Sequence, residues 1–233
     1  MRELVISSPG RKNALSTAIL EALARELADA AGEPVLLTGE GNAFSAGLDL
    51  SEVARMDVNG ARRLLSALED LVESVFTYPA PTVALVNGHA IAGGCVLALC
   101  CDRRIATADP AARIGLNEVA LGLLFPPRTL AMVRARLGPA AAAAVLGAEL
   151  LDPLRALQAG LVDEVAADPR SAALAWLEAR SRHPRAAYAA AKASLHAQVF
   201  DRAEEERQRF EDEVLPRWTS AETKAALSRA LKR

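Results

Sequence analysis

The segment that most constrains the fold of this 233-residue chain is a nearly unbroken apolar run from residue 82 to residue 101. It reads TVALVNGHAIAGGCVLALCC, and its twenty residues approach the length of a helix that crosses a membrane. Two dipeptides interrupt it, Asn87-Gly88 and Gly93-Gly94, and both are typical of turns. The run therefore predicts a buried strand over TVALV, a turn, and a buried helix from about Gly94 to Cys101, with no membrane span.

Short apolar runs alternate with helical patterns along the first two thirds of the chain, which is typical of βαβ units and of an α/β fold. From about residue 169 onward every segment has a helical pattern, so we expect the sheet to end before it. Residues 41–50, GNAFSAGLDL, are predicted to form a loop of small residues. Strands are predicted over residues 3–8, 34–40, 103–108, 112–116 and 161–165, and helices over residues 17–31, 51–78, 128–138 and 153–160.

Charge and cysteine content exclude several classes of protein. The formal net charge is -2, so the chain has no overall excess of positive charge with which to bind nucleic acid. Cys95, Cys100 and Cys101 lack the paired spacing of zinc and redox motifs, and we expect reduced core residues and no metal site. The start, MRELVISSPGRKN, lacks the apolar region and cleavage site of a secretion signal, which predicts a cytoplasmic location.

The glycine pair at residues 93–94 lies between a predicted strand and a predicted helix. The first turn of such a helix presents backbone N–H groups without intrahelical partners, and these groups bind negative charge. Neither a phosphate loop, which needs Lys and Ser or Thr, nor a G-x-G-x-x-G dinucleotide motif is present. On spacing alone, a glycine that merely allows close packing explains the pair equally well.

A second loop of the same kind favours the functional interpretation. FSAGLDL, residues 44–50, follows a predicted strand and begins the next helical stretch. Two loops that each end a strand and begin a helix can direct one amide each at a single oxygen. This is the geometry of an oxyanion hole, which stabilises negative charge that develops during a reaction.

Three motifs now point to one family. FSAGLDL, NGHAIAGGCVLALCCDRRIA (residues 87–106) and IGLNEVALGLLFP (residues 114–126) together resemble the crotonase, or enoyl-CoA hydratase/isomerase, superfamily. The resemblance covers nearly the whole chain, from KNALS at residues 12–16 through AGLVDEV at residues 159–165 into the C-terminal helices. The N-terminus is shorter than is usual in the family.

The resemblance implies a fold, an assembly and a ligand. The fold is a spiral of ββα repeats over residues 1–168, followed by a helical region over residues 169–233 that builds homotrimers or dimers of trimers. The substrate is an acyl-CoA thioester, with no separate cofactor. By position in the motifs, the backbone N–H groups of Leu48 and Gly93 hold the thioester oxygen, and a larger residue at Gly93 is expected to lose backbone clearance.

The resemblance also identifies a catalytic acid and a missing one. Hydratases of this family carry one glutamate three residues after the oxyanion-hole glycine, where this chain has Val96, and a second in the position of Glu118. One carboxylate suffices to move a double bond from C3–C4 to C2–C3, because the same group takes a proton from C2 and returns it at C4. FSAGLDL and IGLNE, together with an apolar residue at Val96, also look most similar to the Δ3,Δ2-enoyl-CoA isomerase branch.

Two other functions fit the sequence as well. A hydratase could use Asp49 or an acid from elsewhere in the chain, and a non-catalytic member could bind acyl-CoA or a protein. Ala46, Asp49 and Phe125 are candidate substrate-binding residues, although Asp49 is more typical of a helix cap and Phe125 of a turn. Among the remaining candidates, His89 is predicted to be a hydrogen-bonded core histidine, and Asn117 either orients Glu118 or satisfies loop backbone.

Overall fold

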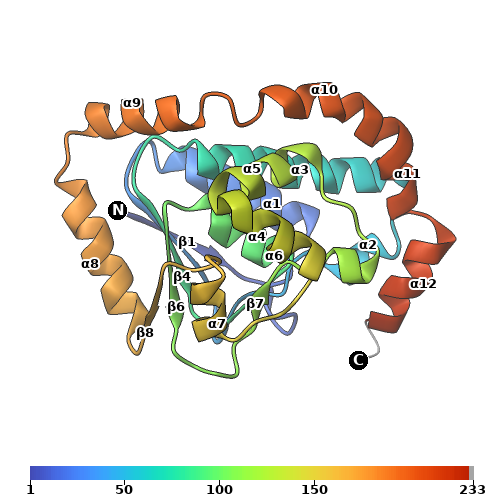
Figure 1. The fold of residues 1–233 in the computed structure, drawn as a ribbon, viewed down its shortest axis with the longest axis horizontal. Helices are drawn as coiled ribbons and strands as arrows, with labels where there is room; N and C mark the ends of the chain where they lie inside the picture. The colour runs from blue at the N-terminus through green and yellow to red at the C-terminus, as the bar shows by residue number, and fades with distance from the viewer. Residues whose placement is uncertain (231–233) are drawn as a thin grey trace.

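Successive turns of the chain build two separate parallel sheets in the computed structural model, which describes residues 1–230 (Figure 1). Within these residues, a five-stranded sheet has the order β1-β2-β4-β6-β8, and a three-stranded sheet has the order β3-β5-β7. The first sheet comprises Arg2–Ile6, Val35–Gly39, Thr82–Val86, Arg103–Thr107 and Glu164–Ala166. The second comprises β3 (Ala43–Ser45), β5 (His89–Ile91) and β7 (Ile114–Gly115).

Helices separate these strand pairs, so the chain repeats a ββα unit and forms the predicted crotonase-type spiral. In the core they are α1 (Thr17–Asp29), α2 (Leu50–Val53), α3 (Val58–Phe76), α4 (Gly93–Cys100), η1 (Val119–Leu121), α5 (Pro127–Leu137), η2 (Gly138–Ala140), α6 (Ala141–Gly147) and α7 (Pro153–Gln158). The C-terminal helices are α8 (Pro169–Ser181), α9 (Arg185–His196), α10 (Asp201–Arg209), the π-helical η3 (Phe210–Val214), α11 (Leu215–Trp218) and α12 (Ala221–Ala230).

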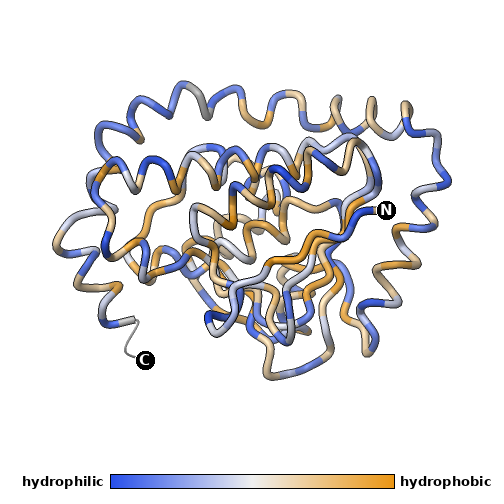
Figure 2. Tube along the Cα trace, turned by 180° about the vertical axis from the view of Figure 1, so that it is seen from behind, coloured by the Kyte–Doolittle hydropathy of each residue, from blue (hydrophilic) through white to orange (hydrophobic). Residues whose placement is uncertain are grey.

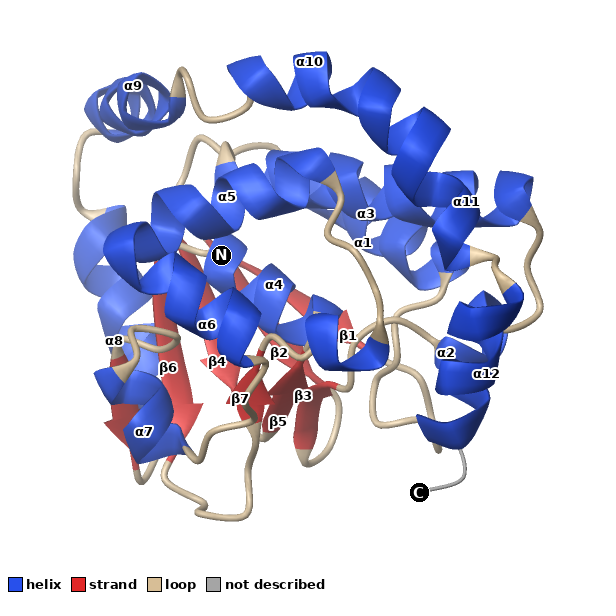
Figure 3. Ribbon diagram, turned by 45° about the vertical axis from the view of Figure 1, so that its right-hand side comes forward, coloured by secondary structure: helices blue, strands red, loops and turns tan. Residues whose placement is uncertain are grey.

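The central strands β2 and β4 are buried at every position, which explains why they read as nearly continuous apolar runs. Figure 3 shows α1, α3, α4 and α5 gathered on one side of the strands. On the other face, Leu36, Val83, Leu85 and Ile105 of the sheet pack against α8 through Ala173 and Leu177. Hydrophobic segments accordingly concentrate along the central strands, while α10 is mainly hydrophilic (Figure 2).

The apolar run at residues 82–101 folds as a strand and a helix, as predicted, but the sequence interpretation missed a strand between them. All eight residues of α4 are buried, which suits a helix that is apolar on every side. The helix begins at Gly93, and β5 precedes it. Residues 41–50 were also predicted wrongly as a loop, because β3 lies within them and pairs with β5.

The C-terminal helices are anchored to the core through Asp102, which follows α4. Its carboxylate accepts hydrogen bonds from the Thr82 N–H at 3.0 Å, the Tyr188 hydroxyl at 3.0 Å and the Lys192 ammonium at 2.9 Å. Tyr188 and Lys192 belong to α9, which together with α10 runs over α3 and α5 in Figure 1. The interpretation of Asp102 as a residue that ties down the chain is confirmed.

The predicted boundary at residue 168 falls between β8 and α8 and stays a prediction, because α8 packs back onto the sheet. The last three residues of the predicted helical region, 231–233, lie outside the described residues. Assembly into trimers also stays a prediction.

One helical stretch within residues 1–230, Pro127–Gly147, is long and apolar enough to cross a membrane, with a mean hydropathy of 1.3. A single stretch of this kind is weak evidence for a membrane span, because core helices of soluble proteins pass the same test. The stretch comprises α5, η2 and α6, and Gly138, with φ 53°, stands at the end of α5.

Candidate active site

Two loops meet at the carboxyl ends of β3 and β5. Because these strands are parallel neighbours, the residues that follow Ser45 and Ile91 emerge at the same edge of the small sheet. The first loop carries Gly47 and Leu48, and the second carries Gly93. A Cβ atom placed on Gly93 would lie 3.5 Å from the Leu48 nitrogen, so the two predicted oxyanion-hole amides are close together.

Both amides are free to bind a ligand. Leu48 pairs with Leu15 in a parallel bridge, in which the Leu15 N–H donates to the Gly47 carbonyl at 2.8 Å and the Asp49 N–H donates to the Leu15 carbonyl at 2.9 Å. The N–H of Leu48 itself therefore faces away from Leu15. Gly93 is the first residue of α4, where N–H groups have no intrahelical partner. Neither N–H donates a hydrogen bond to any of residues 1–230.

Both loops contain a residue with an unusual backbone conformation. Gly47 has φ +87°, a conformation that glycine adopts readily, and a Cβ there would lie 2.8 Å from the Ile91 carbonyl oxygen. Ala92 has φ 48° and ψ -121°, which costs a residue with a side chain about 1–3 kcal/mol. Its N–H donates to the Gly115 carbonyl at 2.8 Å, and its own carbonyl accepts from Val96 at 2.9 Å. These bonds fix the direction of the next amide, that of Gly93.

The two glycines of the pair have different tasks. A Cβ on Gly94 would collide with the Ser45 carbonyl oxygen, so Gly94 allows α4 to pack closely against β3. A Cβ on Gly93 would have its nearest neighbour, a Leu15 methyl, at 3.4 Å, an ordinary contact distance. The expectation that a larger residue at Gly93 loses clearance is therefore wrong, and the close packing belongs to Gly94.

The loops form one side of a narrow pocket with about 450 Å³ of empty space, its mouth included. The pocket brings together the predicted residues Ala46, Leu48, Gly93, Glu118 and Phe125, but not Asp49. Its lining is mainly hydrocarbon, as an acyl chain requires. The other lining residues are Leu50, Leu68, Ala92, Val96, Leu123, Leu124, Pro126, Thr129 and Trp218.

Glu118 is the one ionisable residue among the described residues that line this pocket. It immediately precedes η1 and is 8% exposed. Its Oε2 is buried and has no hydrogen-bond partner in residues 1–230. Burial raises the pKa of the Glu118 carboxyl to about 7, so near neutral pH the group can both accept and release a proton.

Comparison with known proteins agrees with this geometry. The family model for enoyl-CoA hydratase/isomerase matches residues 2–230. The chain belongs to the enoyl-CoA hydratase/isomerase family. Among solved structures, human mitochondrial Δ3-Δ2-enoyl-CoA isomerase has a TM-score of 0.91 and 28% identity, with coverage of 99% of this chain and 93% of that one.

Two relatives of the enoyl-CoA hydratase/isomerase family bear hydratase names. A Thermus thermophilus protein whose assigned name is enoyl-CoA hydratase is 40% identical over 169 residues, which span 69% of this chain and 66% of that protein. The 2,3-dehydroadipyl-CoA hydratase of Escherichia coli is 34% identical over 82% of this chain and 76% of that protein. These similarities show the family. The names of the similar proteins include both hydratases and an isomerase.

Asp49 is the N-terminal cap of α2, as the sequence favoured. Its carboxylate accepts from the N–H groups of Ser51 at 2.9 Å and Glu52 at 3.3 Å, and it is ion-paired with Arg11. Burial acts to raise the pKa of Asp49, but the hydrogen bonds from Ser51, Arg11 and Glu52 outweigh it and lower the pKa. The side chain caps α2 and does not line the pocket.

The remaining candidates also lie outside the pocket. His89 accepts a hydrogen bond at Nδ1 from the Arg113 N–H at 3.0 Å, as predicted, but it is only half-buried and is not the core residue that was expected. The Asn117 Oδ1 is buried without a partner in the described chain, and no hydrogen bond ties it to Glu118 or to loop backbone. The three cysteines are free and buried, and burial raises the pKa of each thiol.

Sequence reasoning missed two polar residues of the pocket, Thr129 and Trp218. Thr129 lies in the first turn of α5, shortly after Phe125, which was a predicted substrate-binding residue. Trp218 ends α11 and reaches the pocket from the C-terminal region. The prediction that Phe125 binds substrate indicated the part of the chain that contains Thr129. No local sequence pattern indicates Trp218.

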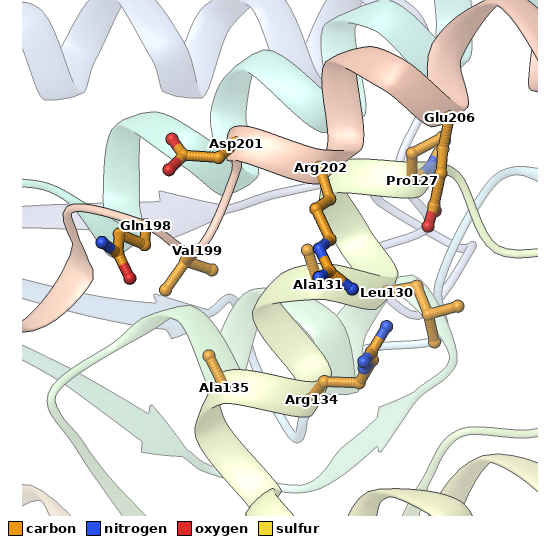
Figure 4. A pocket seen from close by; sticks show the side chains of 10 residues that line it. All are labelled: Pro127, Leu130, Ala131, Arg134, Ala135, Gln198, Val199, Asp201, Arg202 and Glu206. Carbon is orange, nitrogen blue, oxygen red and sulfur yellow. The ribbon is translucent and has the colours of Figure 1, made fainter.

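A larger cleft lies on the other side of α5 and has different chemistry. It has about 900 Å³ of empty space between α5 and α10, with Arg134, Arg202, Asp201 and Glu206 among its lining residues. Figure 4 shows the two arginines extending into the same space. No predicted site residue lines this cleft, and its mixed charges do not suit an acyl chain.

In the described part of the chain, no three His, Cys, Asp or Glu side chains gather to hold a metal ion.

Proposed function

We propose that this member of the family is an enoyl-CoA isomerase that moves a double bond from C3–C4 to C2–C3 of an acyl-CoA thioester. The observation that carries the proposal is the single carboxylate of the pocket, Glu118. Val96, which is 1% exposed, stands where the family's hydratases have their other glutamate. The family acts on acyl-CoA thioesters, and the apolar lining suits the acyl portion.

The first step removes a proton from C2. The thioester oxygen accepts hydrogen bonds from the Leu48 and Gly93 N–H groups, and the ionised Glu118 carboxylate takes the C2 proton. The electron pair of the broken C–H bond forms a C1–C2 double bond, and the carbonyl pair moves onto the oxygen as an enolate. Fixed amides at that oxygen lower the barrier, since losing one such donor costs about 2.7–4 kcal/mol in comparable sites.

The second step returns the proton at C4. The C3–C4 π pair forms the new C4–H bond with the proton held by Glu118, and the C1–C2 pair moves to C2–C3 while the carbonyl reforms. Glu118 ends the cycle as a carboxylate, so no second acid or co-reactant is needed. A pKa of about 7 suits both steps, because general acid–base catalysis is most efficient when the pKa lies near the working pH.

Hydration is the second candidate, because both sequence relatives described above bear hydratase names. Addition of water to a 2-enoyl thioester requires one group that activates water at C3 and one that delivers a proton at C2. Asp49, the substitute that the sequence suggested, is held by Arg11 and the α2 amides. The described lining of the pocket thus supports the one-carboxylate reaction better.

Purified protein should be given a 3-enoyl-CoA and, separately, a 2-enoyl-CoA, and the products followed by mass and by absorbance of the conjugated thioester. We expect the 3-enoyl-CoA to become conjugated with no change of mass. Glu118→Gln should abolish this turnover, while Glu21→Gln, at an exposed position of α1, should retain it. Efficient gain of water by the 2-enoyl-CoA would establish the hydratase instead, and binding of both esters without turnover would establish a binding protein.

A further inference from the structure

Besides Glu118, two other residues of the pocket have a buried hydrogen-bonding group without a partner in the described chain. Thr129 is 1% exposed and Trp218 is 3% exposed. The Thr129 Oγ1 and the Trp218 Nε1 have no hydrogen-bond partner within residues 1–230. Both residues line the same pocket, among side chains that are otherwise hydrocarbon except for Glu118. Buried polar side chains in native proteins are normally hydrogen-bonded, so two such groups in one ligand pocket require a partner.

Local structure does not supply that partner. A helical threonine commonly bonds the carbonyl one turn earlier, but the Thr129 hydroxyl does not. Glu69 of α3 satisfies the start of α5 instead, since it accepts the Arg128 N–H at 2.6 Å. The hydroxyl is therefore not needed as a cap. Trp218 brings an indole N–H, which can only donate.

The charge of the pocket limits what can bind there. No Lys, Arg or His is among its described lining residues, and the one ionisable group is the Glu118 carboxyl. A second carboxylate in this place would be buried beside Glu118 without a counter-ion, which is strongly unfavourable. A neutral oxygen, by contrast, accepts a hydrogen bond without bringing charge into the apolar space.

We propose that the acyl chain of the substrate carries a neutral oxygen, a hydroxyl or ketone beyond C4, which accepts hydrogen bonds from the Trp218 indole and the Thr129 hydroxyl. The two residues are specificity-determining residues, with no part in the proton transfer. The proposal rests on the proposed function in that it uses the same pocket, but binding of a non-reacting ester tests it separately.

The test is calorimetric titration with saturated acyl-CoA esters of one chain length. One ester is unsubstituted, one ends in a carboxylate, and the others carry a single hydroxyl at successive carbons beyond C4. At one or more positions the hydroxyl should tighten binding by roughly two- to tenfold, as neutral hydrogen bonds do. The terminal carboxylate should weaken it. If no hydroxylated ester binds more tightly than the unsubstituted one, the proposal is overturned.

Variants assign the effect to the two residues. Trp218→Phe and Thr129→Val should each bring the affinity ratio of hydroxylated to unsubstituted ester toward one, whereas Thr129→Ser, which keeps the hydroxyl, should preserve it. Trp176→Phe is the matched control, because this tryptophan lies on α8 and does not line the pocket. A ratio that survives both substitutions would overturn the proposal. Loss of 3-enoyl-CoA turnover with an intact ratio would overturn the isomerase function alone.

Discussion

Replacing Glu118 by Gln should stabilise the protein, and the gain should depend on pH. The folded protein raises the pKa of this carboxyl from 4.5 to about 7. Each unit of difference corresponds to about 1.4 kcal/mol, so the ionised group lowers the free energy of unfolding by about 3 kcal/mol. Glutamine has a similar shape and does not ionise, so Glu118→Gln removes this penalty.

The sign follows from proton binding. Below pH 4.5 the carboxyl is protonated in both folded and unfolded protein, and burial carries no charge penalty. Between 4.5 and about 7 the folded state binds more protons than the unfolded state, so the free energy of unfolding falls as pH rises. Above about 7 the penalty is complete and constant.

Urea unfolding of both proteins across this pH range measures the effect. The difference in free energy of unfolding, Glu118→Gln minus wild type, should grow by about 3 kcal/mol from the acid to the alkaline end. Glu21→Gln provides the control, since its exposed carboxyl should give a difference that is nearly independent of pH. A constant difference for Glu118→Gln would show that the carboxyl titrates normally, and the reasoning about its burial would be refuted.

Three further predictions concern the reaction and the fold. The kcat/KM for a 3-enoyl-CoA should rise with pH and level off above about 7, because Glu118 acts first as a base; a fall across this range in a pH–rate profile would contradict that role. Gly47→Ala should lower kcat by about 10²-fold or more in steady-state assays, since it displaces an oxyanion-hole amide. Gly10→Ala is its control, with φ +73° but open space around it, and an equal loss there would point to a general effect of strain. Asp102→Asn should cost about 3–5 kcal/mol in chemical unfolding, because it leaves the buried Lys192 unpaired, and adding Lys192→Met should recover part of the loss; no recovery would contradict this explanation.

The central strands β2 and β4 of the large sheet could be predicted because they are apolar runs bounded by turn residues. In the small sheet, β7 lies within the strand predicted over residues 112–116, but β3 and β5 were missed, because three residues are too few to show a strand period. Their pairing joins Ala43 to His89, which are far apart in the chain, so tertiary contacts rather than local preference fix them. The geometry of the two loops depends on this unpredicted pair of strands.

The site likewise has features that the sequence predicted and features that only the structure shows. Glu118 stood out as a carboxylate in an apolar motif, and the structure confirms its burial. The sequence could not show which of the two glycines allows close packing. Only the contact with Ser45 identifies Gly94 as that residue. Trp218 reaches the pocket through the path of the C-terminal helices, and nothing in its neighbouring sequence predicts that position.

Transfer of deuterium within the substrate tests the central claim, that Glu118 alone carries the proton from C2 to C4. A 3-enoyl-CoA deuterated at C2 should be converted in ordinary water, and the product of early turnovers analysed by mass and NMR. Glu118 holds one acidic proton after it takes the deuterium from C2, and its carboxyl is buried in a mainly apolar pocket, so transfer to C4 competes with exchange with solvent. Deuterium at C4 of the conjugated product is the expected result. A product whose C4 carries only solvent hydrogen from the first turnovers would contradict the single-carboxylate mechanism.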